Sequence, residues 1–193
     1  MRKLTWMLAS CSAIGLLLVL TPALVLDTHA AMQSSAARMA LNDKSYREVL
    51  PRAETFEKEG GLYKHIRGYA RGADGENELV GFVFLTKDLG ARARGYNGLI
   101  PILVGMDLRG RISGVIIMKH YEPYGYRCIN RPEYREQFED KSIFDAFEIG
   151  VDIDAYSGAT ITTVAATKSI RHAARRMARE FLAKKSKSQE NQE

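Results

Sequence analysis

The segment from residue 161 to residue 181 constrains the fold more than any other, because its apolar residues recur at spacings near three and four. The apolar positions are Ile161, Val164, Ala166, Ile170, Ala173, Met177 and Phe181. The basic positions, which fall largely on the opposite side, are Lys168, Arg171, Arg175, Arg176 and Arg179. This pattern predicts an amphipathic helix whose apolar face must pack against other elements.

The residues directly before this helix are Asp-Ala-Tyr-Ser-Gly-Ala-Thr, at positions 154 to 160. Ser157 and Gly158 are typical of helix starts, so we expect Thr160 in or just before the first turn. The backbone N–H groups there lack partners within the helix and favour an anion such as phosphate. On local pattern alone, the same residues also fit an ordinary capped helix in which Asp154 is a capping carboxylate.

The word Asp-x-x-Ser-Gly-Ala-Thr resembles the flavinylation motif of the FMN-binding domain family. That family includes components of the sodium-translocating NADH:quinone reductase and of the Rnf complex, and regulators of the NosR type. In it, the last Thr of the motif carries FMN through a phosphoester bond, installed by a flavin transferase that uses FAD as donor. The resemblance places covalent FMN on Thr160 and gives Asp154 a role in recognition by the transferase. The other motif positions are Ser157, Gly158 and Ala159.

The region between residues 62 and 120 has the composition of β-strands joined by turns. Tyr63–Tyr69 and Leu79–Leu85 flank a turn and predict one hairpin. Ile100–Met106 and Ile112–Met118 flank a loop that contains Gly110 and predict a second hairpin. We therefore expect an α+β fold, in which an antiparallel sheet of hairpins packs with the C-terminal amphipathic helix.

Two loops next to the second hairpin resemble flavin-proximal parts of the family. The first is Gly95-Tyr96-Asn97-Gly98, in which the resemblance places Gly98 near the flavin, although glycines there also suit a plain turn. The second begins His120-Tyr121-Glu122-Pro123 and is closer to the His-x-Glu-Pro form of NosR-type regulators than to the Glu-Thr-Pro-Gly form of the respiratory complexes.

In this second loop, Tyr124 and Tyr126 are candidates to stack on the flavin, because an aromatic ring can cover the isoalloxazine. The alternative is that both tyrosines pack on their own domain. A single His at a strand end, such as His120, is typically a hydrogen-bonded structural residue.

The N-terminal residues predict a membrane segment. Arg2 and Lys3 precede an uncharged run at residues 4–26, which is long enough to span a bilayer and places the following chain outside the cytoplasm. An uncleaved anchor, cleavage after Ala30 and a lipoprotein signal at Cys11 all remain open. We divide the chain into an anchor or signal segment (1–30), a tether (31–45), an FMN-binding domain (46–183) and a disordered tail (184–193).

Composition excludes several classes of function. The net charge is +5, but basic and acidic residues are interspersed, and no nucleic-acid motif or metal-ligand spacing is present. The two cysteines, Cys11 and Cys128, are far apart and cannot pair if the first lies in or is removed with the anchor. Neither a nicotinamide-binding fingerprint nor a catalytic acid/base pair is present, so we expect a component of an electron-transfer system rather than a complete enzyme.

The leading hypothesis is a membrane-tethered, extracytoplasmic (periplasmic) electron carrier with FMN on Thr160. Its partners would be the flavin transferase, a respiratory donor and acceptor (quinone, cytochrome or an oxidoreductase component) and the membrane, with no nucleic acid. The alternative is an accessory or regulatory FMN-binding domain that supports maturation of a partner oxidoreductase. A flavin-free domain that keeps the fold is a third possibility, and the Thr160 hydroxyl argues against it.

Overall fold

The structure is a computed structural model that describes residues 41–59, 63–125 and 128–190, with side chains described as far as residue 181. The expected membrane segment, most of the expected tether and Tyr126 lie outside these residues. No helix in the described ranges has both the length and the apolar character needed to cross a bilayer.

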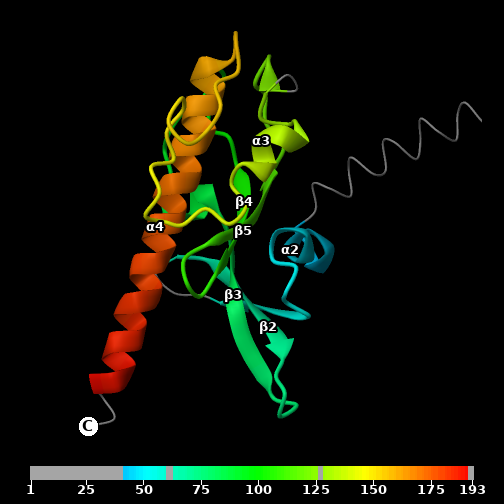
Figure 1. Cartoon of the computed structure of the whole chain (residues 1–193), viewed down its shortest axis with the longest axis vertical. Helices are drawn as coiled ribbons and strands as arrows, with labels where there is room; N and C mark the ends of the chain where they lie inside the picture. Colours follow the sequence, from blue (N-terminus) through cyan, green and yellow to red (C-terminus); the bar gives the residue numbers. More distant parts are fainter. Residues whose placement is uncertain (1–40, 60–62, 126–127, 191–193) are drawn as a thin grey trace, which may run out of the picture. The chain divides into compact units, whose positions relative to one another are not determined.

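The centre of the fold is a five-stranded antiparallel sheet in the order β1-β2-β3-β4-β5, so each strand pairs with the next one along the chain (Figure 1). The strands are β1 (Thr55–Glu59), β2 (His65–Arg71), β3 (Asn77–Leu85), β4 (Ile102–Asp107) and β5 (Ile112–Ile117). Both predicted hairpins are present, as β2–β3 and β4–β5, and the α+β class is confirmed.

The sequence analysis did not predict β1. Its residues are Thr-Phe-Glu-Lys-Glu, and none of them is fully buried. An edge strand pairs through its backbone on one side only, so it needs little of the apolar alternation that marks a strand in the sequence. Three charged residues in five therefore hid it.

Alternation along β3 and β4 gives the sheet two buried faces. On one face, Val83 and Leu103 pack with Val49 and Leu50 of α2 (Asp43–Val49) and the turn that follows it. On the other, the side chains of Phe82, Phe84, Ile102, Val104 and Met106 pack against the apolar face of α4 (Thr160–Glu190). Pro51 lies just after the end of α2, because a proline disfavours the helical conformation in the residue before it.

The predicted amphipathic helix is α4, and it begins at Thr160. Its buried residues include Ala166, Ile170, Ala173 and Met177, which form the centre of the larger core. The helix continues to Glu190, whereas the sequence analysis placed the end of the domain at residue 183 and a disordered tail after it. Lys, Gln and Glu are good helix formers, so a helix already begun can extend through them at little cost.

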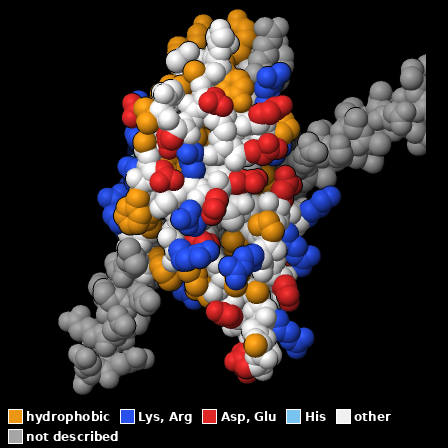
Figure 2. Space-filling model, viewed as in Figure 1, with side chains coloured by type: hydrophobic (Ala, Val, Ile, Leu, Met, Phe, Trp, Pro, Cys, Tyr) orange, Lys and Arg blue, Asp and Glu red, His pale blue; other side chains and the backbone are white. Residues whose placement is uncertain are grey.

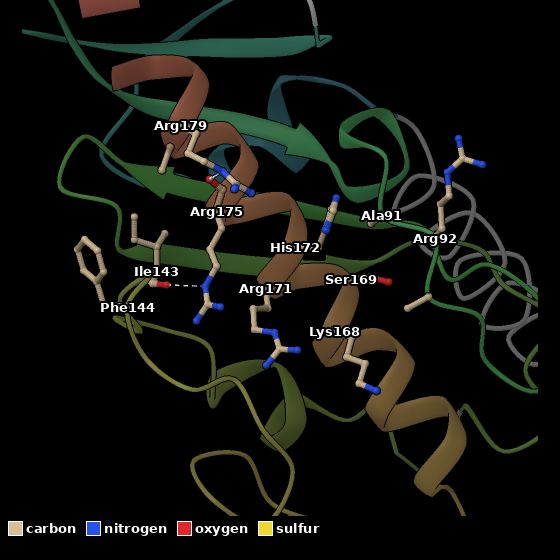
Figure 3. Close-up of a pocket in the computed structure, with 12 residues that line it drawn as sticks. Ala91, Arg92, Ile143, Phe144, Lys168, Ser169, Arg171, His172, Arg175 and Arg179 are labelled. Atoms are coloured by element: carbon tan, nitrogen blue, oxygen red, sulfur yellow. Dashed lines mark hydrogen bonds between the residues drawn. The ribbon is translucent and has the colours of Figure 1, made fainter. Parts of the chain in front are cut away.

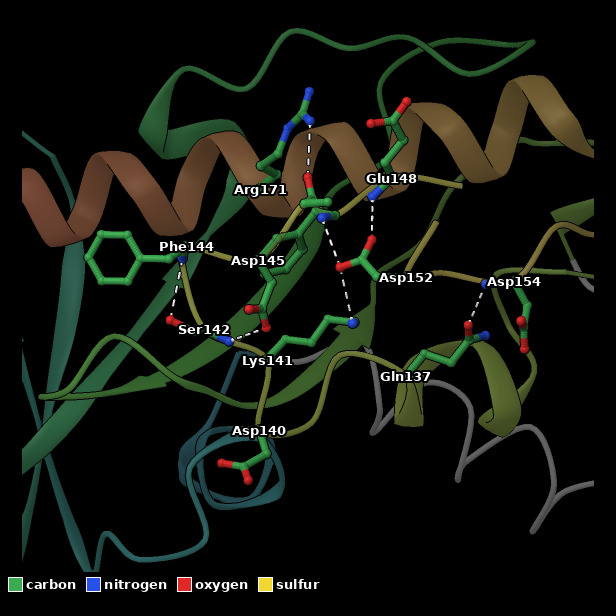
Figure 4. A network of polar contacts seen from close by, with 12 residues as sticks. Gln137, Asp140, Lys141, Ser142, Phe144, Asp145, Glu148, Asp152, Asp154 and Arg171 are labelled. Atoms are coloured by element: carbon green, nitrogen blue, oxygen red, sulfur yellow. Dashed lines mark hydrogen bonds and ion pairs between the residues drawn. The ribbon is translucent and has the colours of Figure 1, made fainter. Parts of the chain in front are cut away.

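The segment between α3 (Pro132–Glu136) and α4 has no regular structure, and one carboxylate organises its central part. Asp152 accepts hydrogen bonds from the backbone N–H groups of Phe147 at 3.0 Å and Glu148 at 2.7 Å, and from Lys141 Nζ at 3.1 Å (Figure 4). Partial burial acts to raise the pKa of Asp152, but these three donors outweigh it and hold the pKa below its ordinary value. Asp152 thus fixes the path by which the chain approaches Thr160.

We expect Asp152→Asn to lower the free energy of unfolding at pH 7 by about 2–3 kcal/mol, because an amide cannot accept from all three donors. A lowered folded-state pKa contributes stability above the ordinary carboxyl pKa, and this contribution is lost as the pH falls through the folded value. The deficit of the variant should therefore shrink between pH 7 and pH 3 in urea titrations.

Asp154→Asn is the matched control, because the Asp154 side chain is exposed and makes no hydrogen bond to any described residue. A deficit of equal size at both pH values, or equal effects of the two variants, would contradict the role given to Asp152.

Candidate functional site

Thr160 is the first residue of α4, and its side chain is exposed. A tight turn precedes it, in which the Ala159 N–H donates to the Tyr156 carbonyl at 3.2 Å. Gly158 has φ +74°, the left-handed value that the third position of a type II turn requires. A side chain at Gly158 would meet no atom within 4 Å, so the turn leaves open space beside Thr160.

The first turn of α4 has unused backbone donors. The first bond is donated by Thr163 N–H to the Ala159 carbonyl at 3.0 Å, and within the described ranges the N–H groups of Thr160, Ile161 and Thr162 have no acceptor. Three free N–H groups at the positive end of a long helix attract a phosphate. The Thr160 hydroxyl therefore lies where a phosphoester would be stabilised.

A hollow of about 520 Å³ lies beside Thr160. Its walls are the side chains of Ile161, Val164, Ala165 and Lys168 from α4, and Ala93 and Arg94 from the segment after η1 (Thr86–Leu89). Apolar walls with two cations suit a flat aromatic group that carries a phosphate, and the size falls within the usual range for ligand sites. The residues present therefore fit an FMN group.

Glu122 connects three segments around this site. Its carboxylate accepts hydrogen bonds from the backbone N–H groups of Tyr96 and Asn97, both at 2.8 Å, and from Thr162 Oγ1 at 2.5 Å. The residue is 8% exposed. The glycine-rich turn, the loop after β5 and the first turn of α4 are thereby joined at a single buried group.

The surroundings of Glu122 keep it ionised. Burial acts to raise the pKa of Glu122, but the donors Thr162, Asn97 and Tyr96 outweigh burial and lower the pKa below its ordinary value. Gly95 makes this approach possible, because a Cβ there would lie 2.5 Å from the Glu122 carboxyl carbon. Close packing against the Glu122 carboxylate therefore accounts for the glycine at position 95.

Large apolar side chains are exposed around the same end of the domain. Tyr96, Tyr121, Tyr124 and Ile161 are between 51% and 75% exposed. Figure 2 shows hydrophobic side chains at its top, the end at which α4 begins in Figure 1. A ring that covers a bound flavin must be exposed before the flavin binds. Tyr124 meets this requirement, and so do Tyr96 and Tyr121.

The other predicted site residues fall close to Thr160 or at the edge of the site. Ser157 is exposed and Ala159 is buried within the turn. The Asp154 N–H donates to Gln137 Oε1 at 2.6 Å, and the Asp154 side chain is exposed. The Gly98 carbonyl accepts from Gly95 N–H at 2.7 Å and closes the glycine-rich turn.

His120 and Cys128 have structural contacts in the described residues. His120 Nδ1 accepts from the Glu122 N–H at 3.1 Å, so Nε2 carries the hydrogen that faces Asn130 Oδ1 at 3.0 Å. The Cys128 thiol is buried and unpaired, and it donates to the Tyr124 carbonyl at 3.3 Å. No cluster of potential metal ligands occurs among the residues that the structure describes.

The sequence analysis missed Glu122, Thr162 and Arg94 as parts of the site. Glu122 lies in the loop that was singled out, but its role depends on donors 25, 26 and 40 residues away along the chain. A carboxylate inside a loop of aromatic residues was the one available signal, because a buried charge requires partners.

Comparison with known protein families agrees with this geometry. The sequence pattern of the FMN-binding domain matches residues 95–175, a range that contains the glycine-rich turn, Glu122 and Thr160. The three segments that are joined by hydrogen bonds to Glu122 all lie within this matched range.

Characterised relatives cover more of the chain. The G component of an ion-translocating oxidoreductase complex from Methanosarcina acetivorans is 32% identical over 139 residues, covering 67% of this chain and 71% of that protein. The G component of a proton-translocating ferredoxin:NAD(+) oxidoreductase complex from Clostridium ljungdahlii is 34% identical over 90 residues, or 43% of this chain and 48% of the relative. The G component of an ion-translocating oxidoreductase complex from Vibrio atlanticus is 28% identical over 126 residues, with 60% and 57% covered. The chain thus spans about half the length of the latter two relatives.

We expect Thr162→Val to lower the free energy of unfolding by about 1–3 kcal/mol, because it removes a donor from a buried carboxylate and keeps the side-chain shape. Thr160→Val is the matched control two residues earlier and should change stability by less than about 0.5 kcal/mol, since Thr160 is exposed. Chemical denaturation of both flavin-free variants at pH 7 measures the difference. Equal losses would show that Thr162 does not stabilise Glu122.

Proposed function

Because the chain belongs to the FMN-binding domain family, we propose that it is a flavoprotein electron carrier with FMN esterified to Thr160 Oγ1. The observation that carries this proposal is the position of Thr160: an exposed hydroxyl at the start of α4, beside a hollow of about 520 Å³ and three N–H groups that have no acceptor among the described residues. No other hydroxyl in this turn of the helix combines these properties.

The two neighbouring threonines differ in this respect. Thr162 Oγ1 is engaged with Glu122, and Thr163 Oγ1 donates to the carbonyls of Ala159 at 3.0 Å and Thr160 at 3.1 Å. Both side chains are buried. An enzyme that modifies this segment can therefore reach Thr160 without unfolding the helix.

Attachment proceeds by group transfer from FAD. Thr160 Oγ1 attacks the phosphorus on the flavin side of the FAD pyrophosphate, the bond to the bridging oxygen breaks and AMP leaves. A hydroxyl is a weak nucleophile, so its proton must pass to a base of the flavin transferase. The exposed Asp154 carboxylate, six residues before Thr160, is available for recognition by that enzyme.

Residues of this chain would hold the group after attachment. The N–H groups of Thr160, Ile161 and Thr162 face the phosphate, and Arg94 and Lys168 add positive charge to the hollow. The hollow's apolar walls would contact the ring, while Tyr124 and the neighbouring exposed tyrosines limit access of water. The bound flavin supplies the redox chemistry by accepting and donating electrons.

The names of the relatives support an electron carrier over an accessory maturation domain, because the proteins from Methanosarcina acetivorans and Vibrio atlanticus are components of ion-translocating oxidoreductase complexes. The donor and acceptor would accordingly be respiratory: a quinone, a cytochrome or another component of a membrane complex. We also propose that residues 1–30 anchor the chain with its domain on the extracytoplasmic side, on the basis of the uncharged run at residues 4–26 and the preceding Arg2 and Lys3.

The attachment site can be tested by fluorescence. We expect the full chain, produced with an active flavin transferase, to fluoresce under ultraviolet light after denaturing electrophoresis. Thr160→Ala should remove this signal completely and leave a folded domain, because the exposed Thr160 side chain contributes less than about 0.5 kcal/mol to stability. Thr160→Ser should retain part of the signal, because it keeps the hydroxyl.

Thr162→Ala is the control, and it should stay fluorescent unless the first turn of α4 unfolds, which circular dichroism would report. Fluorescence in the Thr160→Ala variant, or a flavin peptide that maps to Thr162 or Thr163, would refute attachment at Thr160. A dark wild-type band, with the transferase active on another substrate, would refute covalent flavin altogether.

A further inference from the structure

The outer face of α4 carries a strong net positive charge. Between Thr160 and Arg179 the sequence contains five Lys and Arg residues and no Asp or Glu. Within the described ranges, Lys168, Arg171 and Arg175 form no ion pair with a carboxylate. Figure 2 shows Lys and Arg side chains along the edge where α4 lies in Figure 1.

Most of this charge lines one groove of about 700 Å³. We call it the cationic groove, and its charged residues are Arg92, Lys168, Arg171, Arg175 and Arg179. Lys168, Arg171 and Arg175 project from the same side of α4, with Ile143 and Phe144 on one flank and Ala91 and Arg92 on the other (Figure 3). Phe144 is 85% exposed, so an aromatic side chain also projects at the rim.

The guanidinium groups in the groove are fixed by neutral partners. Arg175 donates from Nε to the Ile143 carbonyl and from Nη2 to the Asp145 carbonyl, both at 2.8 Å. Arg171 Nη1 donates to the Ala146 carbonyl at 3.2 Å (Figure 4). A carbonyl orients a guanidinium without cancelling its charge, so these two cations are held in place and still attract an anion.

Two carboxylates near the groove have other partners, and a third, Glu148, lines a neighbouring hollow with Lys168 and Arg171 but forms no ion pair with either among the described residues. Asp145 Oδ2 accepts from the Ser142 N–H at 2.9 Å, and Asp152 is occupied by Lys141 and two backbone N–H groups. Side chains of the groove's own walls therefore do not neutralise it.

The cationic groove is continuous with the hollow beside Thr160. Ala93 and Lys168 line both. With a rise of about 1.5 Å per residue, the charged stripe runs about 16 Å along α4 from Lys168 to Arg179, and Lys168 lies about 12 Å along the helix axis from Thr160. A partner that binds along the stripe is thereby brought next to the proposed flavin.

We propose that the cationic groove is the docking surface for an acidic redox protein that exchanges electrons with the flavin. This inference rests on the proposed function for the electron exchange, whereas the docking itself depends only on the charge and shape of the groove. Complementary charge would speed the encounter and orient the partner's redox centre toward the Thr160 end of α4.

The shape of the groove favours a protein partner over an anionic membrane surface. Arg171 and Arg175 are half-buried and flanked on both sides, so a flat layer of headgroups would meet the rim before it met these cations. A convex acidic surface can enter the groove and pair with them. A membrane surface would also gain nothing from the continuity with Thr160.

The test measures electron transfer from the photoreduced, flavin-loaded chain to two small proteins of opposite charge. Plastocyanin, which has an acidic patch, is the probe, and basic cytochrome c is the control. In each reaction one flavin reduces two acceptors, Cu(II) to Cu(I) or Fe(III) to Fe(II). We expect the bimolecular rate constant for plastocyanin to fall at least tenfold as ionic strength rises from about 10 mM to about 0.5 M, because salt screens the attraction.

The double variant Arg92→Glu/Arg179→Glu reverses two exposed charges of the cationic groove that do not line the hollow beside Thr160. Within the described ranges, the one hydrogen bond that these two side chains donate runs from Arg179 Nε to the Arg175 carbonyl of the same helix. We expect it to slow the plastocyanin reaction about tenfold at low salt and not to slow the cytochrome c reaction. Lys44→Glu/Arg52→Glu makes the same change in net charge at exposed positions in and just after α2, on the opposite face of the sheet, and should alter the plastocyanin rate less than twofold. Equal effects of the two double variants, or a plastocyanin rate that ignores salt, would overturn the proposal.

Two further measurements separate the possible failures. Flavin fluorescence after denaturing electrophoresis reports loading, and titration calorimetry of plastocyanin against flavin-free chain reports docking without a cofactor. Binding to the unloaded wild type that the groove variant loses would support docking even if the proposed attachment fails. If the wild type and the groove variant bind plastocyanin equally, and only the wild type binds vesicles of anionic lipid, an acidic protein is not the occupant of the groove and the proposal is overturned.

Discussion

The buried carboxylate of Glu122 is the contact on which the geometry of the Thr160 end depends. It joins the glycine-rich turn, the loop after β5 and the start of α4, segments that are separated by up to 40 residues along the chain. An ionised group this deeply buried is costly unless several donors face it, and two backbone N–H groups and a hydroxyl do so here. The arrangement is therefore cooperative, since loss of one donor leaves the charge poorly compensated and loosens all three segments.

The contacts of Glu122 explain why the Thr160 hydroxyl is accessible in the first turn of α4, whereas the hydroxyls of Thr162 and Thr163 are not. Glu122 engages Thr162 on the inner side of α4, and Thr163 is satisfied by backbone carbonyls in the same turn. Helical periodicity then points Thr160 outward, where Gly158 leaves open space and the hollow beside Thr160 begins. Asp152 fixes the approach from the other direction by holding the segment that leads to the turn. Selective chemistry at Thr160 thus follows from how its neighbours are bonded.

The sequence predicted those parts of the fold that leave a periodic record. The helix that starts at Thr160 buries one face, so its apolar residues recur at the helical period, and the central strands of the two hairpins are buried on both faces, so they appear as apolar runs. The edge strand β1 and the last turns of α4 lack that record, because neither depends on burying a face in the way that the central elements do. The contacts of Glu122 leave no periodic pattern in the sequence, since the fold brings its partners together from distant segments. The expected roles of Ser157, Ala159, Gly98 and Asp154 still depend on the family resemblance, and the structure adds their positions.

The cationic groove gives a physical reason for the one-sided charge of α4. A helix that only had to pack its apolar face could carry mixed charges on its outer face, and pairs of opposite charge would stabilise it slightly. This helix instead carries five cations and no acid between Thr160 and Arg179, which costs self-repulsion. Carbonyl groups from residues 143–146 hold two of the cations in place, so the repulsion is retained in an ordered surface. A positive electrostatic field next to the proposed flavin site is what we expect of a surface that selects its partner by charge.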